Sequence, residues 1–448
     1  MRIRPLRCAR ALAIAAAAVL GARASAAPPR ELPRLPVREF TLENGMRFLL
    51  VPQPESRTVA AGWVARVGSL YEHPGETGTV HFLEHMMFKG SRTIASGELG
   101  RLYSEAGGRG INALTLQDMT LYFVVLPAEK LELWFWLESD RVREPAFREL
   151  VTEKKVVAEE RRLRIESTPT GRLDERLRAA FWKGHPYGGS TLGSAEDIAA
   201  LDRTRAEGYL RTYFRPDNLT AALVGNFEPD AVRRLAERYF GRLARPALPL
   251  PALPAAPPAL TQDERLPGTC SCRDQVEALY RTVAFTHPDR APLEVLVGLL
   301  NGRTGRLYQR LVLEKGQAFS ASALQTPLAR SGFLSFSGEA RGGTSPEQLL
   351  AAWDAELVRL REEPIPPAEL EKVKNQILAD GYRRFRDPSA LMMQLLMSDG
   401  FGDWHEIDAH PRRALAVTAA DVSRVVATYL DPARRTVGLY RRTPEGAR

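Results

Sequence analysis

The chain has 448 residues, of which 44% are apolar and 26% are charged, and its formal net charge at pH 7 is +8. This composition is typical of a globular protein and excludes a disordered or fibrous chain, and the length suffices for two or three domains. The sequence holds no run of about 20 apolar residues, so we predict no membrane span.

The first 26 residues are typical of a secretory signal peptide. A basic segment, MRIRPLRCAR, precedes the short apolar core ALAIAAAAVLGA, and Ala24, Ser25 and Ala26 form a small-residue cleavage signal. We therefore predict an exported protein, periplasmic if the source is Gram-negative. The leader contributes five arginines and no acidic residue, so the mature chain is only weakly basic and we expect no nucleic-acid partner.

The mature chain opens with a proline-rich tether, residues 27–37, for which we expect no folded structure. A β-hairpin is predicted next, because apolar runs flank Asn44 and Gly45, a strong two-residue turn signal. The segment TVAAGWVARVGS, residues 58–69, predicts a further strand.

A metal-binding pattern follows in the segment GTVHFLEHMMFKGS. His81, Glu84 and His85 form H-x-x-E-H, the reverse of the zinc-peptidase motif H-E-x-x-H. On a helix, His81 and His85 lie one turn apart on one face and can bind a single ion, while Glu84 lies beside them and can take a proton from a water at the metal. The alternative, a helix with two exposed histidines, requires a chance match in a chain with seven histidines.

A third ligand is expected on another element, because a catalytic zinc site usually has three protein ligands. The segment ELVTEKKVVAEERRLRIES predicts a charged helix over residues 149–167. Glu153 and Glu160 are seven residues apart and share a helical face, whereas Glu159 points elsewhere. We choose Glu160 as the ligand and Glu153 as a carboxylate that orients a ligand. Taken alone, this helix is more typical of a solvated charged surface than of a metal site.

A second proline-rich run divides the mature chain into halves of similar length. RPALPLPALPAAPPAL predicts an extended linker over residues 245–264, between an N-terminal module (38–244) and a C-terminal module (265–442) that lacks the metal motif. Each half repeats a helix-to-strand pattern, with Tyr213 three residues before Pro216 and Tyr429 three residues before Pro432. We predict an α+β fold of two related modules.

Two cysteines remain after the leader, Cys270 and Cys272, in the order C-x-C. An oxidising compartment allows a disulfide between them or to a partner chain. The simpler interpretation is two small side chains on a half-buried strand, and their redox state is left open.

Together these segments resemble the pitrilysin family of inverted zinc peptidases, which includes insulin-degrading enzyme and mitochondrial processing peptidase, and most of all its short bacterial members. The resemblance covers roughly residues 38–442. It implies two related modules, each an antiparallel sheet backed by helices, and a zinc-dependent endopeptidase of extended peptides with one zinc ion per chain. It also implies that Asn112 and Ala113, in GGRGINALTLQDMTLYFVVLP, line the substrate groove.

The second module departs from the family pattern. Members of the family usually supply an Arg and, seven residues later, a Tyr that stabilise the oxyanion and the substrate carbonyl. The corresponding positions here, in GRTGRLYQRLVLEKGQAFSAS, are Val312 and Phe319, which donate no hydrogen bond. The resemblance therefore implies the zinc-binding subunit of a heterodimer whose partner supplies both groups. A homodimer is the second choice, and a catalytically silent zinc-binding protein with a structural or peptide-binding role is the third.

Overall fold

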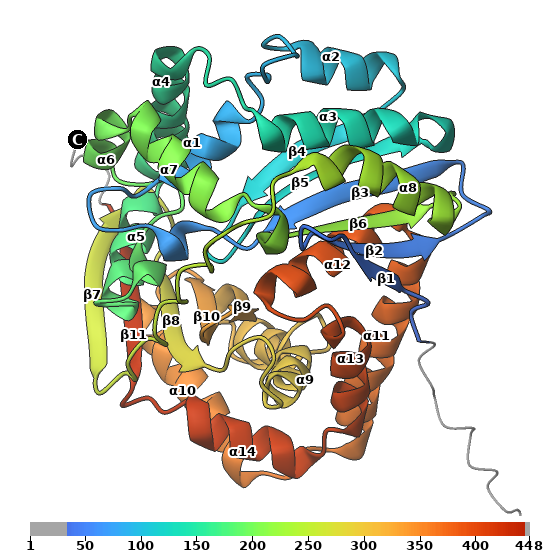
Figure 1. Cartoon of the computed structure of the whole chain (residues 1–448). Helices are drawn as coiled ribbons and strands as arrows, with labels where there is room; N and C mark the ends of the chain where they lie inside the picture. The colour runs from blue at the N-terminus through green and yellow to red at the C-terminus, as the bar shows by residue number, and fades with distance from the viewer. Residues whose placement is uncertain (1–33, 444–448) are drawn as a thin grey trace, which may run out of the picture.

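The computed structural model describes residues 34–443, which form two β-sheets with helices packed against both (Figure 1). The predicted signal peptide and residues 27–33 of the predicted tether lie outside the described residues. The end of the tether is held against the body, because the backbone N–H of Leu35 donates to both carboxylate oxygens of Asp408, at 3.3 and 3.1 Å.

The first sheet has the strand order β1-β2-β6-β3-β5-β4. The hairpin predicted at Asn44 and Gly45 is confirmed, since β1 pairs antiparallel with β2 and Thr41 lies opposite Arg47. Within the described residues, β2 and β6 form the one parallel pair of this sheet. Its strands are β1 (Arg38–Thr41), β2 (Arg47–Pro52), β3 (Thr58–Ala65), β4 (Arg109–Thr115), β5 (Thr120–Pro127) and β6 (Leu219–Gly225).

The second sheet repeats this topology. Its order is β7-β11-β8-β10-β9, and β7 and β11 are its one parallel pair among the described strands. Without β1, the strands of the two sheets correspond one to one, so β4 and β9 are equivalent edge strands. The strands are β7 (Asp263–Cys270), β8 (Gln275–Thr282), β9 (Ala318–Pro327), β10 (Gly332–Ala340) and β11 (Arg435–Arg442). The prediction of two related modules is confirmed, with one parallel pair added to each antiparallel sheet.

Fourteen α-helices accompany the sheets within the described residues. The predicted helix-to-strand repeat is confirmed as α7 followed by β6 and α14 followed by β11. The helices are α1 (Thr79–Met86), α2 (Glu98–Glu105), α3 (Leu131–Arg143), α4 (Leu150–Arg161), α5 (Gly171–Phe181), α6 (Ala195–Ala200), α7 (Arg203–Tyr213), α8 (Pro229–Tyr239), α9 (Arg290–Leu300), α10 (Pro346–Glu362), α11 (Pro367–Arg386), α12 (Pro388–Phe401), α13 (Glu406–Ala416) and α14 (Ala419–Tyr429).

The first sheet buries both of its faces. Side chains alternate along a strand, so Phe48 and Leu50 of β2 join the core formed with α1, α3, α7 and α8, while Leu49 and Val51 join a separate core with α12. The metal-motif helix α1 therefore packs on the face opposite α12.

Each module has one helix that packs on the sheet of the other module. Helix α12 belongs to the second half of the sequence but packs on β3 and β6 of the first sheet. In return, Leu177 and Phe181 of α5 pack with Phe333 and Tyr440 of the second sheet. The proline-rich linker therefore does not separate two independent cores.

The predicted linker has no helix or strand between residues 243 and 262, and β7 begins at Asp263, so it includes the last two residues of the predicted linker. His185 Nε2 is hydrogen-bonded to the carbonyl of Ala255, at 3.0 Å, which ties the linker to the first module. Cys270 and Cys272 are joined as a disulfide, which differs from the interpretation we favoured.

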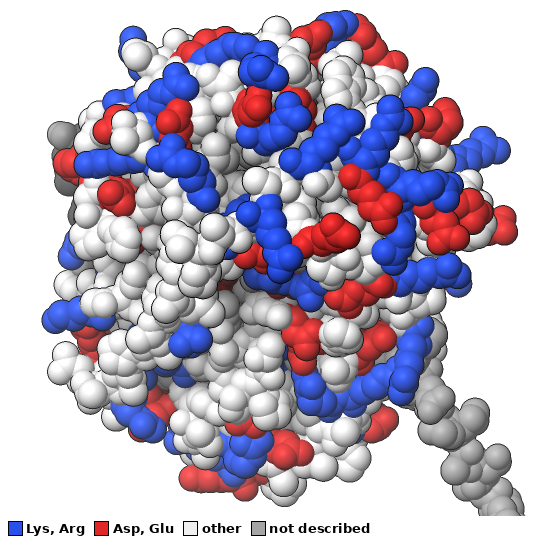
Figure 2. Space-filling view, viewed as in Figure 1, with Lys and Arg blue, Asp and Glu red and all other residues white. Residues whose placement is uncertain are grey.

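Positive and negative side chains are interspersed over the upper part of the face shown in Figure 2, and its left centre is largely uncharged. No helix among the described residues is long and apolar enough to cross a membrane.

Candidate metal centre

The helix α1 is anchored at its N-terminus by a buried carboxylate. Glu72 accepts hydrogen bonds from the N–H groups of Gly78, at 2.9 Å, and Val80, at 2.8 Å. These groups have no partner within the helix, so Glu72 satisfies them and fixes the direction of α1. Burial raises the pKa of Glu72 to about 7. Sequence reasoning missed Glu72, because a glutamate seven residues before the start of a helix carries no cap signal.

The three predicted ligands converge. Glu160 Oε2 lies 3.6 Å from His81 Nε2 and 3.3 Å from His85 Nε2, and all three ligand atoms lie within 4.8 Å of one another. Ligand atoms of a tetrahedral zinc ion with bonds of about 2.0–2.1 Å stand about 3.4 Å apart. The donor set and its spacing therefore fit one zinc ion.

Burial keeps the first histidine neutral, as a metal ligand must be. His81 is 6% exposed. Its pKa is lowered to about 3, chiefly by burial and further by the nearby His85 and Arg164 charges. His81 Nδ1 has no hydrogen-bond partner among the described residues, so only the second histidine is oriented by a carboxylate.

That carboxylate is Glu153, on the first turn of α4. Its Oε1 lies 2.9 Å from His85 Nδ1, and its Oε2 lies 2.6 Å from Lys89 Nζ. A proton on Nδ1 leaves the lone pair of His85 Nε2 directed toward Glu160. Lys89 was not predicted, because a lysine near a helix end is ordinarily a solvated side chain.

Glu160 also has a partner on its other oxygen. Arg164 Nη2 lies 3.0 Å from Glu160 Oε1, so the second oxygen, Oε2, faces the histidines. Arg164 follows on the π-helical segment Arg162–Glu166, which continues α4. Glu159 pairs instead with Arg162 and is exposed. The structure thus brings Glu160, and not Glu159, to the two histidines.

Glu84 lies beside the ligands and is held by a threonine of β4. Thr115 Oγ1 donates to Glu84 Oε2 at 2.6 Å. Glu84 is 8% exposed, and burial raises its pKa, an effect that the Thr115 hydrogen bond partly opposes. Sequence reasoning missed Thr115, since nothing in the sequence shows that a strand threonine lies beside the motif helix.

Asn112 and Ala113 lie on β4 and line the same cavity, of about 380 Å³, as the histidines and glutamates. Asn112 is exposed, whereas Ala113 is buried. Strand β4 is at the edge of the sheet, so one side of its backbone pairs with no other described strand.

Val312 and Phe319 do not line this cavity. Val312 packs against the core of the second module, and Phe319, 56% exposed on β9, lies under the Arg273 guanidinium at 4.0 Å. The nearest arginines in the sequence are engaged, because Arg306 and Arg310 both pair with the buried Glu356, at 3.4 and 3.2 Å.

Comparison with known proteins places the chain among peptidases. A family model described as Insulinase (Peptidase family M16) matches residues 47–195, and one described as Peptidase M16 inactive domain matches residues 200–377. The zinc protease PqqE of Helicobacter pylori is 27% identical over 415 residues, which cover 90% of this chain and 92% of the relative.

Solved structures share the fold. A protease from Helicobacter pylori has a TM-score of 0.86 at 25% identity, covering 90% of this chain and 99% of that chain. The periplasmic protease PqqL from Escherichia coli has a TM-score of 0.76 at 20% identity, covering 92% of this chain but 48% of that chain. With both modules matched by models of one family, the chain belongs to the insulinase, or pitrilysin-like, M16 peptidase family.

Proposed function

We propose that the protein is a zinc-dependent endopeptidase, or the catalytic subunit of one, with a single zinc ion held by His81, His85 and Glu160. The observation that carries this proposal is the approach of Glu160 Oε2 to both Nε2 atoms, at 3.6 and 3.3 Å. Zinc, when bound, supplies a Lewis acid that makes a water molecule more acidic near neutral pH.

Glu84 acts as the general base. Because Thr115 occupies Oε2, the other oxygen, Oε1, is left to accept a proton from the attacking water. Burial raises the pKa of Glu84, which makes its carboxylate a better base than an exposed one. The same carboxyl group can then deliver the proton to the leaving amine nitrogen.

The substrate is an extended peptide or an unfolded segment that adds as a strand to the edge of the first sheet. Strand β4 offers its unpaired backbone next to the ligands, and Asn112 adds an exposed amide on the same strand. Main-chain hydrogen bonds of this kind bind many sequences and position the scissile bond.

A partner chain completes the site. Val312 and Phe319 have no donor to stabilise an oxyanion, and Arg306 and Arg310 are already paired with Glu356. The match to PqqL covers only 48% of that chain, so that relative carries a second half of similar length within one polypeptide. We favour a heterodimer with a family member that supplies an Arg and a Tyr, and a homodimer second.

A catalytically silent, peptide-binding role is the competing function. The lack of a donor at Val312 and Phe319 favours it, whereas the buried and hydrogen-bonded Glu84 favours catalysis.

The first test is hydrolysis of a quenched, unstructured peptide by the mature zinc-loaded chain alone, with Glu84→Gln as control. A cleavage rate that falls by about 10²- to 10⁴-fold in the variant supports Glu84 as the general base. If zinc binds at one ion per chain without cleavage, the assay is repeated with the co-purifying partner. Failure in both assays favours the silent role, and failure to bind zinc contradicts the proposal.

We also propose that the protein is exported. The support is the leader-like sequence of residues 1–26. N-terminal sequencing of the protein from its source cell is expected to begin at Ala27, and an intact Met1 would contradict export.

A further inference from the structure

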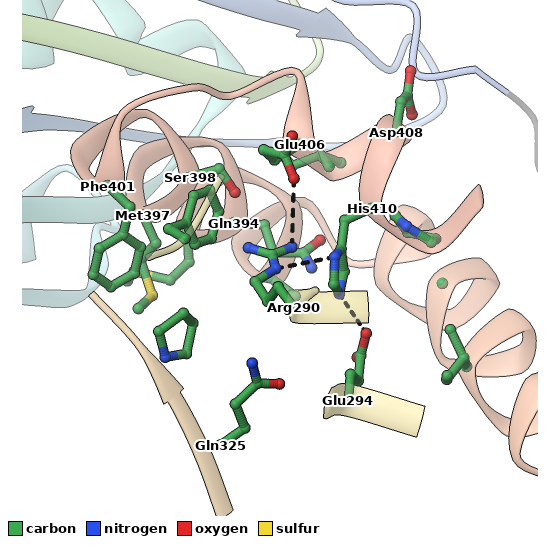
Figure 3. Close-up of a pocket in the computed structure, with 18 of the residues that line it drawn as sticks. Arg290, Glu294, Gln325, Gln394, Met397, Ser398, Phe401, Glu406, Asp408 and His410 are labelled. Carbon is green, nitrogen blue, oxygen red and sulfur yellow. Dashed lines mark hydrogen bonds and ion pairs between the residues drawn. The ribbon is translucent and has the colours of Figure 1, made fainter. Parts of the chain in front are cut away.

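A second cavity, of about 650 Å³, lies where the two modules meet (Figure 3). Helix α12, which packs on the first sheet, forms one wall, and α9, α11, α13 and β9 form the others. None of its lining residues lines the cavity of the metal centre. Its volume lies within the range of about 300–1,000 Å³ that is usual for small-molecule sites.

Most of its wall is apolar and adaptable. Met393 and Met397 of α12 contribute flexible thioethers, which adjust to the shape of a ligand. Leu324 of β9 is 60% exposed, so the cavity opens to solvent at that strand. The other large apolar residues of the wall include Phe285, Val297 and Phe401.

One end of the cavity holds a buried arginine. Arg290 is 7% exposed, lies 4.0 Å over the Phe285 ring, and donates from Nε to His410 Nδ1 at 3.0 Å. Its Nη2 lies 3.9 Å from Glu406 Oε2, and neither Nη1 nor Nη2 donates a hydrogen bond to another described residue. Burial lowers the pKa of Arg290 to about 10, so the guanidinium is charged at neutral pH.

The acidic residues of the same wall, including Glu406, which lies 3.9 Å from Arg290, also have partners besides Arg290. Glu294 is hydrogen-bonded to His410 Nε2, Glu406 pairs with Arg413, and Asp408 accepts from the backbone of Leu35. Figure 3 shows Arg290, His410 and Glu294 linked in one chain of contacts. Arg290 is the one arginine or lysine among the described lining residues, and its planar fork is occupied only by the long 3.9 Å contact between Nη2 and Glu406.

We propose that this cavity binds a monocarboxylate with an apolar body, its carboxylate against the Arg290 fork and its apolar part along Met393 and Met397. A planar fork matches a carboxylate in a bidentate pair. A single arginine with Glu406 nearby disfavours a dianion such as a phosphate monoester. Two kinds of molecule carry a carboxylate on an apolar body, a free fatty acid and a short apolar peptide with a free C-terminus.

The test is calorimetric titration of the mature chain with decanoate and with decanol, without added metal. Decanoate is expected to bind about 10- to 100-fold more tightly than decanol, the ratio expected for a charge-assisted hydrogen bond. Arg290→Met is expected to remove this preference and leave the affinity for decanol unchanged. Arg238→Met, on the exposed surface of α8, serves as the matched control and is expected to change neither affinity.

A second variant tests the location independently of Arg290. Met397→Trp fills the apolar part of the cavity and is expected to weaken the binding of decanoate and of decanol alike. The melting temperature of the variant shows whether it is folded. Equal affinities for the acid and the alcohol, or no effect of Met397→Trp on either ligand, would overturn the proposal.

The two sources are separated by N-acetyl-Leu-Phe as the free acid and as its amide. Binding of the free acid more tightly than decanoate identifies a peptide terminus, and the reverse order identifies a fatty acid. If neither acid binds below about 1 mM, the cavity is not a carboxylate site.

Discussion

Thr115 holds Glu84 through a single hydroxyl, which donates to Oε2 at 2.6 Å. Thr115→Val keeps the shape of the side chain and removes the donor, so Glu84 is left free to turn away from the water that we propose it activates. We expect kcat to fall by about 10-fold or more, as for the loss of a hydrogen bond to a charged group. Steady-state kinetics in whichever assay is active, alone or with the partner, measures the change.

The conservative variant Thr115→Ser retains the hydroxyl and is expected to restore most of kcat. Zinc affinity is expected to be unchanged in both variants, because Thr115 is hydrogen-bonded to Glu84, which is not one of the three proposed ligands. A loss of kcat in Thr115→Ser but not in Thr115→Val would show that packing of the threonine methyl matters, and not the hydrogen bond.

In the proposed zinc site, Glu153 orients His85 through its contact with Nδ1, at 2.9 Å. Glu153→Gln removes the charge that stabilises a proton on His85 Nδ1, and we expect zinc affinity to fall by about 10- to 100-fold. Competition with a chelator of known affinity measures this without an activity assay. Glu159→Gln, on the exposed side of the same helix, is the matched control; similar losses in both variants would contradict the assigned role.

At the scale of elements, α1 depends on the buried carboxylate of Glu72. Its folded-state pKa of about 7 lies above the ordinary value of 4.5, so the folded chain binds a proton more tightly than the unfolded chain does. The contribution of Glu72 to stability is therefore greatest below about pH 4.5 and decreases as the pH rises toward 7, by on the order of 3 kcal/mol.

The prediction is checked by urea unfolding of the metal-free chain and of Glu72→Gln at several pH values. The Gln variant does not titrate, so its stability relative to the wild type is expected to rise as the pH increases from 4.5 to 7.5. A difference between the two proteins that does not change with pH would contradict the raised pKa.

At the scale of the whole molecule, a cluster of ion pairs around a buried carboxylate helps to join the two halves. Asp399 of α12 is fully buried and pairs with Arg47 and with Arg66, the latter at 2.7 Å. Removing the buried carboxylate leaves Arg47 and Arg66, which are partly exposed, without this partner, at a cost of about 1.5–3 kcal/mol for the lost hydrogen bonds between charged groups. We expect Asp399→Asn to lower the free energy of unfolding by that order, as measured with urea.

Asp380→Asn removes a carboxylate that pairs with Arg383 on the exposed surface of α11, and it is expected to change stability by less than about 1 kcal/mol. A similarly small effect of Asp399→Asn would show that α12 is held by its apolar contacts alone.

Most of what could be predicted depended on short patterns of residues that are close together in the sequence. The turn at Asn44 and Gly45, the helix with His81 and His85, and the repeated helix-to-strand pattern each depend on residues close together in the sequence. Such features arise from hydrogen bonds and side-chain spacing within one or two elements, so a single sequence reveals them. The choice of Glu160 over Glu159 also followed from helical periodicity, in agreement with the distances between the ligand atoms.

Other features required contacts between distant segments, and these only the tertiary structure decided. Thr115 reaches Glu84 because β4 lies beside α1, and Asp399 reaches Arg47 across more than 300 residues. The exchange of α5 and α12 between the modules arises because each sheet has a second apolar face that its own half does not cover. The sequence by itself determined the family, the two modules and the donor set that we propose for zinc. Packing decided which residues orient those proposed donors and how the two halves form one body.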